Sequence, residues 1–82
     1  MYIVYALYSK SYDKIYIGYT SNLEQRMLSH NKLSMKGYTL KYRPWIVVYT
    51  ESLDTKKAAL IREKQLKSAK GRDFVWNLIK LM

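Results

Sequence analysis

The chain has 82 residues, 49% of them hydrophobic, which suits one modest core in a single domain rather than a disordered segment. It contains no cysteine, so disulfides, thiolate metal sites and cysteine nucleophiles are excluded. Fifteen Lys and Arg against six Asp and Glu give a net charge of +9, which favours nucleic acid as a partner over a merely solvated basic surface or a membrane surface.

The sequence also carries no sign of a membrane or secretory segment. No apolar run reaches the length of a membrane span, and the N-terminus lacks the charged, apolar and cleavage regions of a signal peptide. We therefore expect a soluble cytoplasmic protein with one domain, residues 1–82. A domain this small gains stability from association, so a homodimer is compatible with the sequence.

Two strands are expected at the start of the chain. Residues 2–9 are apolar, aromatic and β-branched, and residues 14–19 follow after a short polar break, so together they predict a β-hairpin. Gly18 inside the second strand indicates either a bulge or a place where another backbone or a ligand approaches closely.

The middle of the chain predicts a helix, a basic loop and a third strand. Ser21 and Glu24 fit a capping box for a helix that runs to about residue 31. Residues 31–44 are rich in cations and read as a basic loop with room for one helical turn. Residues 45–51 are again β-branched and aromatic and predict the third strand.

Two further helices are expected at the end of the chain. Asp54 should cap a helix that runs to about Ala69. Its inward-facing residues are expected to be Ala58, Ile61 and Leu66. Gly71 should break this helix, and the last one should begin at about Arg72, with one apolar face made of Phe74, Leu78 and Leu81. The order ββαβαα predicts an α/β fold, with a small, mainly antiparallel three-stranded sheet flanked by helices.

Few kinds of catalytic site are open to this sequence. One histidine and no cysteine argue against a zinc centre, and there is no Gly-rich phosphate loop. Arg26 and His30 lie four residues apart on one side of the first helix, beside the apolar stripe of Leu23 and Met27. There they could hold a phosphate, or they could be a surface cation beside a partly buried, hydrogen-bonded histidine.

Glu63 stands mid-helix among cations, and two uses are open to it. Its carboxylate could bind a Mg²⁺ that keeps most of its waters, or it could form an i,i+4 ion pair with Lys67. A two-metal site would need more carboxylates. The nine tyrosines are equally ambiguous, because they can pack in the sheet, present hydroxyls to a cleft or stack on bases.

In this order the residues resemble the GIY-YIG nuclease domain. The matching pieces are Val4-Tyr5, Tyr16-Ile17-Gly18, then Arg26 and His30 on the next helix, and finally Glu63. The run from Tyr16 through Thr20 to Asn22, Leu23 and Arg26 is the most specific part. The resemblance covers nearly the whole chain and extends to small stand-alone bacterial members. One departure is Ile3, where the first triplet of the family has its glycine, although Tyr5 is kept.

The resemblance implies a metal-dependent endonuclease that hydrolyses DNA phosphodiester bonds in DNA repair or processing, with one Mg²⁺ or Mn²⁺. On this analogy Glu63 holds the metal and Arg26 offsets negative charge on the phosphate. Tyr16 acts as general base toward the attacking water, while Tyr5 and His30 orient water or phosphate. The cations expected to contact nucleic acid are Lys14, Lys41, Arg43, Lys67, Lys70 and Arg72. Asn77, near the end of the domain, is more typical of a helix surface.

Two other functions remain open from the sequence. A catalytically inactive module with the same fold would bind nucleic acid through its basic face without cleaving it. A protein-interaction adaptor would instead use Trp45 or Trp76, if either is exposed.

Overall fold

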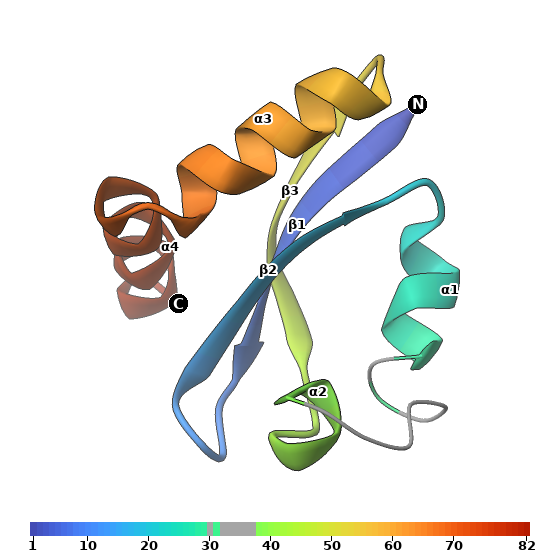
Figure 1. The fold of residues 1–82 in the computed structure, drawn as a ribbon. Helices are drawn as coiled ribbons and strands as arrows, with labels where there is room; N and C mark the ends of the chain where they lie inside the picture. The colour runs from blue at the N-terminus through green and yellow to red at the C-terminus, as the bar shows by residue number, and fades with distance from the viewer. Residues whose placement is uncertain (30, 32–37) are drawn as a thin grey trace.

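The computed structural model describes residues 1–29, 31 and 38–82, and at its centre is a three-stranded antiparallel sheet in the order β2-β1-β3 (Figure 1). Its strands are β1 (Tyr2–Ser9), β2 (Lys14–Thr20) and β3 (Ile46–Leu53). The helices are α1 (Leu23–Leu28), α2 (Tyr38–Lys41), α3 (Lys56–Lys67) and α4 (Ala69–Lys80). The predicted α/β fold is confirmed. The order is ββααβαα, because the basic segment contains a helical turn, α2.

The first hairpin forms as its pattern predicts. β1 and β2 pair antiparallel from Ile3 with Thr20 to Ser9 with Lys14. The turn between them closes at Asp13, whose φ of 54° lies in the left-handed region. The Tyr8 hydroxyl donates to the Asp13 carboxylate at 2.9 Å, which ties the turn back to the strand. β1 is the central strand, so its side chains are buried on both faces of the sheet.

Helices cover both faces of this sheet (Figure 1). On one face, α3 and α4 pack their buried residues Ala59, Leu66 and Val75 against Val4 and Ala6 of β1. On the other face lies a second cluster, in which Leu23 and Met27 of α1 pack against Tyr5, Leu7 and Trp45. β2 and β3 form the two edges of the sheet, and the edge at β2 is the one that carries the candidate site.

The helix starts differ from those predicted. Asn22 rather than Ser21 caps α1, since its side chain accepts a hydrogen bond from the backbone N–H of Gln25 at 3.0 Å. Thr55 rather than Asp54 caps α3, with its hydroxyl accepting from Ala58 N–H at 3.1 Å. In both places the neighbouring residue has equal capping chemistry, and the backbone path from the preceding strand selects between them.

The prediction that Gly71 ends a helix is wrong. α4 begins at Ala69, capped by Ser68, so Gly71 lies in its first turn. A Cβ at this position would collide with the backbone of Gln65 and Leu66 at the end of α3. Glycine is therefore needed for the close packing at the corner between the two helices, rather than to break one of them.

The inner faces of both helices are also rotated relative to the prediction. Leu66 is buried as expected, but Ile61 is 53% exposed, Phe74 40% and Leu81 84%. Both helices have apolar residues on neighbouring stripes, so periodicity alone could not choose between them. In α4 it is Val75 that is fully buried. Trp45 is only 2% exposed, which removes one of the two tryptophans considered for an adaptor.

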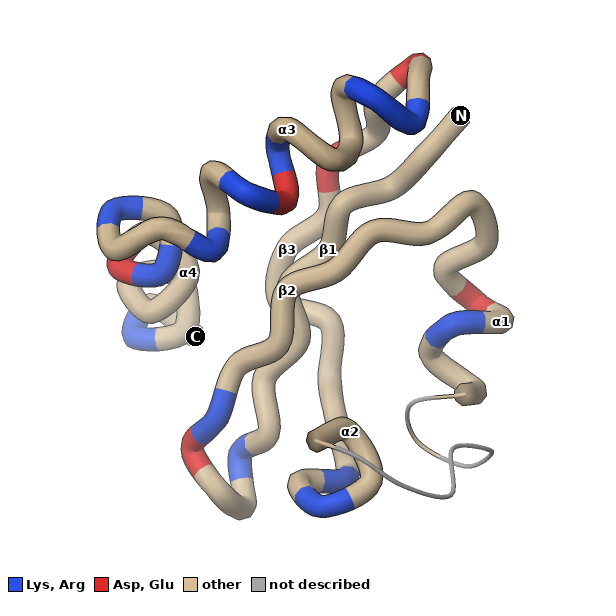
Figure 2. The backbone as a smooth tube through the Cα atoms, in the orientation of Figure 1, with Lys and Arg blue, Asp and Glu red and all other residues tan. Residues whose placement is uncertain are grey.

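Lys and Arg outnumber Asp and Glu fifteen to six, and they are distributed over several elements of the fold (Figure 2). Figure 2 shows them along α3, around α4, at α2 and on the β1–β2 hairpin. Across the described ranges, no helix has the length and apolar character required to cross a bilayer.

Candidate active site

Tyr5 and Gly18 meet across the first hairpin. They are direct partners in the β1–β2 register, which runs without a shift, so Gly18 does not mark a bulge. A Cβ at position 18 would lie 2.7 Å from the Tyr5 hydroxyl oxygen and 2.9 Å from its ring carbon Cζ. Glycine is thus required because the Tyr5 side chain crosses over β2 here. The close approach predicted from the sequence exists, and the approaching group is a side chain.

Tyr16 lies two residues before Gly18 and therefore points to the same face of the sheet. Its ring centre is 6.4 Å from that of Tyr5 and 6.2 Å from that of Trp45. Trp45 is itself fixed, because its backbone N–H donates to the side chain of Asn31 at 2.8 Å and its indole N–H donates to Thr39 O at 2.9 Å. The half-buried Tyr16 ring consequently rests on a rigid aromatic support.

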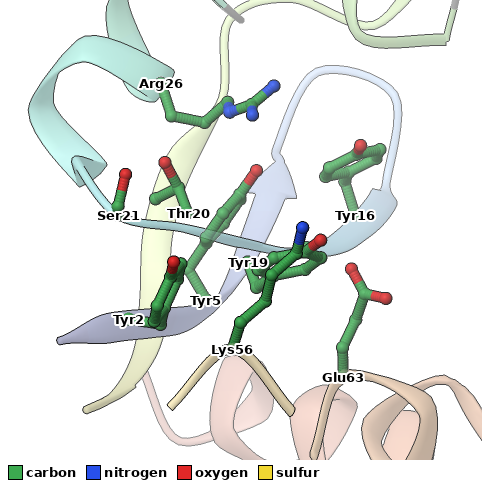
Figure 3. A pocket seen from close by; sticks show the side chains of 10 residues that line it. Tyr2, Tyr5, Tyr16, Tyr19, Thr20, Ser21, Arg26, Lys56 and Glu63 are labelled. Atoms are coloured by element: carbon green, nitrogen blue, oxygen red, sulfur yellow. The ribbon is translucent and has the colours of Figure 1, made fainter. Parts of the chain in front are cut away.

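Arg26 reaches the same place from α1. The connection from β2 to α1 is short and fixed, since the Thr20 hydroxyl accepts from Asn22 N–H at 3.1 Å. Leu23 and Met27 face the buried aromatic cluster, which confirms the predicted inner side of this helix. Arg26, one position before Met27, stays exposed and extends its guanidinium over the cavity (Figure 3).

Glu63 comes from α3, which packs on the opposite face of the sheet. Its carboxylate lies 3.5 Å from the Lys67 ammonium, and its side chain is 18% exposed. α3 is held to β3 by Arg62, whose Nε donates to Glu51 at 3.1 Å. The Glu51 oxygen that accepts this bond also accepts a hydrogen bond from the Tyr49 hydroxyl, at 2.6 Å. Of the two uses that the sequence left open for Glu63, the ion pair with Lys67 forms, and the carboxylate also lines the cavity, where metal binding stays a prediction.

Tyr5, Tyr16, Arg26 and Glu63 line one cavity of about 350 Å³. They come from four different elements: β1, β2, α1 and α3. Figure 3 shows Arg26 on one side, Glu63 on the other and the two tyrosines between them. Because β2 is an edge strand, the cavity wraps around its open edge and receives side chains from both faces of the sheet. The other residues that line it are Tyr2, Gly18, Tyr19, Thr20, Ser21 and Lys56.

The charges in this cavity act on Tyr5. Burial raises the pKa of the Tyr5 phenol well above its usual value of 10.0, and the neighbouring Tyr16 raises it further. The Arg26 charge opposes this shift, while the Glu63 carboxylate adds to it. Tyr5 is therefore a neutral phenol at physiological pH, suited to donating a hydrogen bond and unsuited to accepting a proton as a base.

Lys56 lines the cavity and was not singled out from the sequence. It is exposed at the first position of α3, and its side chain enters the cavity on the same side as Glu63 (Figure 3). One signal could have found it: Lys56 precedes Glu63 by seven residues, which is two helical turns, so both lie on one face of α3. Its position at the start of a lysine-rich helix made it resemble an ordinary surface cation.

The other cations expected to contact nucleic acid are spread around the molecule. Lys67 and Arg72 line a second cavity, also at the β2 edge. Lys14 and Lys41 lie over the ring of Tyr42, at 5.6 and 5.4 Å from its centre. The two remaining cations lie elsewhere, because Lys70 lines a cavity at the α3–α4 corner and Arg43 is half-buried before β3. Asn77 is exposed on α4, as expected of a helix-surface residue. His30 lies outside the described residues.

The oxygen atoms that line this cavity suit a hard cation that takes few ligands from the protein. Of the described residues that line it, Glu63 is the acidic one, beside tyrosine hydroxyls and open volume for water. A Mg²⁺ ion commonly takes one or two carboxylates and keeps several waters, so this donor set fits it. In the part of the chain that the structure describes, no three His, Cys, Asp or Glu side chains gather to hold a metal between them. A cage made of protein ligands alone does not occur there.

Comparison with known proteins identifies the family. Residues 1–77 match the profile of the GIY-YIG catalytic domain. A UPF0213 protein of Staphylococcus haemolyticus is 38% identical over 56 residues, which is 68% of each chain. One of Natronomonas pharaonis is 39% identical over 56 residues, covering 68% of this chain and 66% of the relative. One of Bacillus velezensis is 33% identical over 66 residues, covering 77% of this chain and 67% of the relative.

These relatives come from bacteria and an archaeon, and the matched stretch spans about two thirds of their length. Their names state no activity, substrate or partner, so they support the family assignment and give no information on the reaction. No solved structure matches the chain. The profile match covers nearly the whole sequence and includes Tyr5, Tyr16, Gly18, Arg26 and Glu63. The chain belongs to the GIY-YIG catalytic domain family.

Proposed function

We propose that this protein is a metal-dependent endonuclease that hydrolyses phosphodiester bonds of DNA, in DNA repair or processing. The observation that carries the proposal is the shared cavity of Tyr5, Tyr16, Arg26 and Glu63, which come from four separate elements. Side chains of this chemistry, brought together from distant parts of the sequence at an open strand edge, favour a reaction site over a packing role. The net charge of +9 supports a polyanionic substrate.

The scissile phosphate would lie between the cations of the cavity. The Arg26 guanidinium can donate two parallel hydrogen bonds to phosphate oxygens, and Lys56 supplies a second charge from α3. Both charges offset the negative charge that grows on the phosphate oxygens as the bond is broken. The Ser21 hydroxyl borders the same space and can donate a further hydrogen bond, whereas the Thr20 hydroxyl already donates to the Asn22 carbonyl at 3.2 Å.

Glu63 would hold a single Mg²⁺ or Mn²⁺, with water filling the other positions. When bound, this ion polarises the phosphate and stabilises the leaving oxygen. The carboxylate must give up its contact with the Lys67 ammonium, 3.5 Å away, to take the metal fully. Lys67 is 53% exposed, so it can swing away without cost in buried charge.

The tyrosines would divide the work on the attacking water. Tyr16 would act as the general base, accepting a proton from that water as the water oxygen forms the new bond to phosphorus. Tyr5, held neutral by its burial, donates a hydrogen bond that orients the water or a phosphate oxygen. As the phosphorus–oxygen bond on the far side breaks, the leaving oxygen takes a proton from solvent. His30 is proposed to assist in orientation, as its spacing from Arg26 suggests.

The test is nicking of supercoiled plasmid, branched DNA and single-stranded DNA in the presence of Mg²⁺ or Mn²⁺. Wild type should cut, and Glu63→Ala and Arg26→Ala should lose at least about a hundredfold in rate. Lys57→Ala, an exposed cation next to Lys56 on α3, is the matched control and should cut normally. Equal cleavage by all four proteins would mean that the activity comes from a contaminant or another site.

The ion pair of Glu63 with Lys67 favours one alternative, a nucleic-acid-binding module that does not cleave. In that case the Glu63 carboxylate stabilises α3 through its ion pair, and the cations only bind nucleic acid. This alternative predicts salt-sensitive binding to DNA or RNA that survives Glu63→Ala, with no cleavage under any divalent metal.

A further inference from the structure

A second cavity continues from the first along the same open strand edge. Tyr16 lines both, so the two cavities adjoin at this residue. The first lies toward the Thr20 end of β2 and the second toward the Lys14 end, between α2 on one face and the α3–α4 corner on the other. The second cavity holds about 460 Å³, and its lining residues are Ile15, Tyr16, Ile17, Tyr38, Lys67 and Arg72.

Tyr38 presents a fixed aromatic ring to this second cavity. It is 44% exposed, although its ring stacks on Trp45 with 5.8 Å between centres and 27° between planes. Its hydroxyl donates to the backbone carbonyl of Ile15 at 3.2 Å, on the open edge of β2. Tyr42 packs edge-on against the same ring at 4.8 Å. The ring is thus held from several sides and still reaches solvent.

The charge around this ring suits a phosphate. Among the described residues that line the cavity, Lys67 and Arg72 carry charge and none is acidic. Burial raises the pKa of the Tyr38 phenol and Tyr42 adds to this, whereas the charge of Arg72 acts in the opposite direction. Arg72 therefore lies close enough to act on Tyr38. Farther along the same surface, Lys14 and Lys41 flank the Tyr42 ring.

We propose that this cavity, the β2-edge subsite, binds an unpaired nucleotide next to the bond that is cut, with its base on Tyr38 and its phosphate between Lys67 and Arg72. An exposed aromatic ring beside cations is the combination with which proteins hold single-stranded nucleic acid. A base inside an intact duplex is already stacked and cannot lie on Tyr38 unless it leaves the helix. The subsite therefore selects substrates that are single-stranded or carry an unpaired nucleotide beside the cut. This inference rests on the proposed nuclease site, because that site sets where the neighbouring nucleotide lies.

Binding in EDTA tests the subsite separately from cleavage. Two DNA hairpins with the same duplex stem are compared by fluorescence anisotropy. One has a blunt end and the other carries a short unpaired extension. Wild type should bind the second about tenfold more tightly, and Tyr38→Leu should abolish this preference, since leucine fills the space without an aromatic face. Tyr38→Phe should keep it. Phe74→Leu, which removes another exposed ring on α4, is the matched control and should leave the preference unchanged.

A second readout covers the case in which Tyr38→Leu does not fold. With 2-aminopurine at successive unpaired positions, wild type should quench one position strongly, as stacking on a ring requires. Arg72→Gln, at an exposed position of α4, should weaken binding of the unpaired substrate severalfold and lower its salt dependence by about one ion. Equal binding of both hairpins by wild type, no quenching at any position, or an unchanged preference in Tyr38→Leu would overturn the subsite.

The two proposals can fail independently. If wild type prefers the hairpin with the unpaired end but cleaves no DNA with any divalent metal, the subsite is supported and the nuclease is rejected. Cleavage of duplex and unpaired DNA at equal rates by both wild type and Tyr38→Leu would support the nuclease and reject the subsite.

Discussion

The hydroxyl oxygen of Tyr5 occupies the space that any side chain at Gly18 would need, with only 2.7 Å to a Cβ built there. The two residues are strand partners, one on β1 and one on β2. The first tyrosine of the site and the glycine of the second triplet thus form one structural unit. The glycine leaves room for a phenol that is 1% exposed, and that burial keeps the phenol neutral.

Gly18→Ala should therefore harm activity more than stability. Overpacking at this contact should cost about 1–3 kcal/mol of unfolding free energy. Displacement of the Tyr5 hydroxyl should slow nicking by about a hundredfold, as misplaced catalytic groups do. Plasmid nicking and urea unfolding measure the two effects. In a Tyr5→Phe background the same alanine should slow nicking less than in wild type, because the hydroxyl is gone and only the contacts with Cζ of residue 5, at 2.9 Å, and with the Tyr16 ring, at 3.2 Å, remain. A normal nicking rate for Gly18→Ala would mean that the Tyr5 hydroxyl takes no part in the reaction.

The raised pKa of Tyr5 predicts a loss of stability in alkali. Its pKa in the folded state lies above the unfolded value of about 10.0, so the contribution of Tyr5 to stability is fully present below pH 10 and declines as the pH rises above it. In that range the unfolding free energy should fall by up to about 1.4 kcal/mol per pH unit from this group. Urea unfolding of wild type and Tyr5→Phe between pH 8 and 11 isolates this contribution. The unfolding free energy of wild type minus that of Tyr5→Phe should fall as the pH rises above 10. A difference that does not change with pH would contradict the prediction.

The sequence predicts the strands and the family correctly because both depend on local pattern. Strand periodicity and the Tyr-Ile-Gly run need no knowledge of distant contacts. The helix caps were misplaced by one residue, since Ser21 and Asn22, or Asp54 and Thr55, have similar capping chemistry. The inward faces of α3 and α4 were misassigned, because both helices have apolar residues on neighbouring stripes. Arg26 and Glu63 line one cavity at the β2 edge because of the tertiary arrangement of α1 and α3, which no local sequence pattern reveals.

The corrected cap of α3 gives a stability test. Thr55→Ala removes the hydroxyl that accepts from Ala58 N–H and should cost about 1 kcal/mol. Asp54→Ala, one residue earlier and exposed, should change the unfolding free energy by less than about 0.5 kcal/mol. Chemical denaturation of both variants decides the matter. The reverse ranking would restore Asp54 as the cap.

Lys56 gives a test of substrate contact from α3. If its ammonium meets the phosphate, Lys56→Ala should weaken DNA binding severalfold and lower the salt dependence of binding by about one ion. Lys57→Ala removes an equal charge from the neighbouring position, which does not line the cavity. Binding titrations of both variants at several salt concentrations separate a specific contact from general attraction. Equal effects of the two substitutions would show that Lys56 acts only through net charge.

The ion pair between Glu63 and Lys67 predicts opposite effects of its two members on metal binding. Glu63→Gln removes the carboxylate and should abolish Mn²⁺ binding measured by electron paramagnetic resonance. Lys67→Gln removes the ammonium that lies 3.5 Å from that carboxylate and competes with the metal for it. Mn²⁺ should then bind severalfold more tightly. Lys64→Gln, an exposed cation next to Glu63 in sequence, is the matched control and should change little. Weaker Mn²⁺ binding by Lys67→Gln would mean that the ammonium orients the carboxylate instead of competing for it.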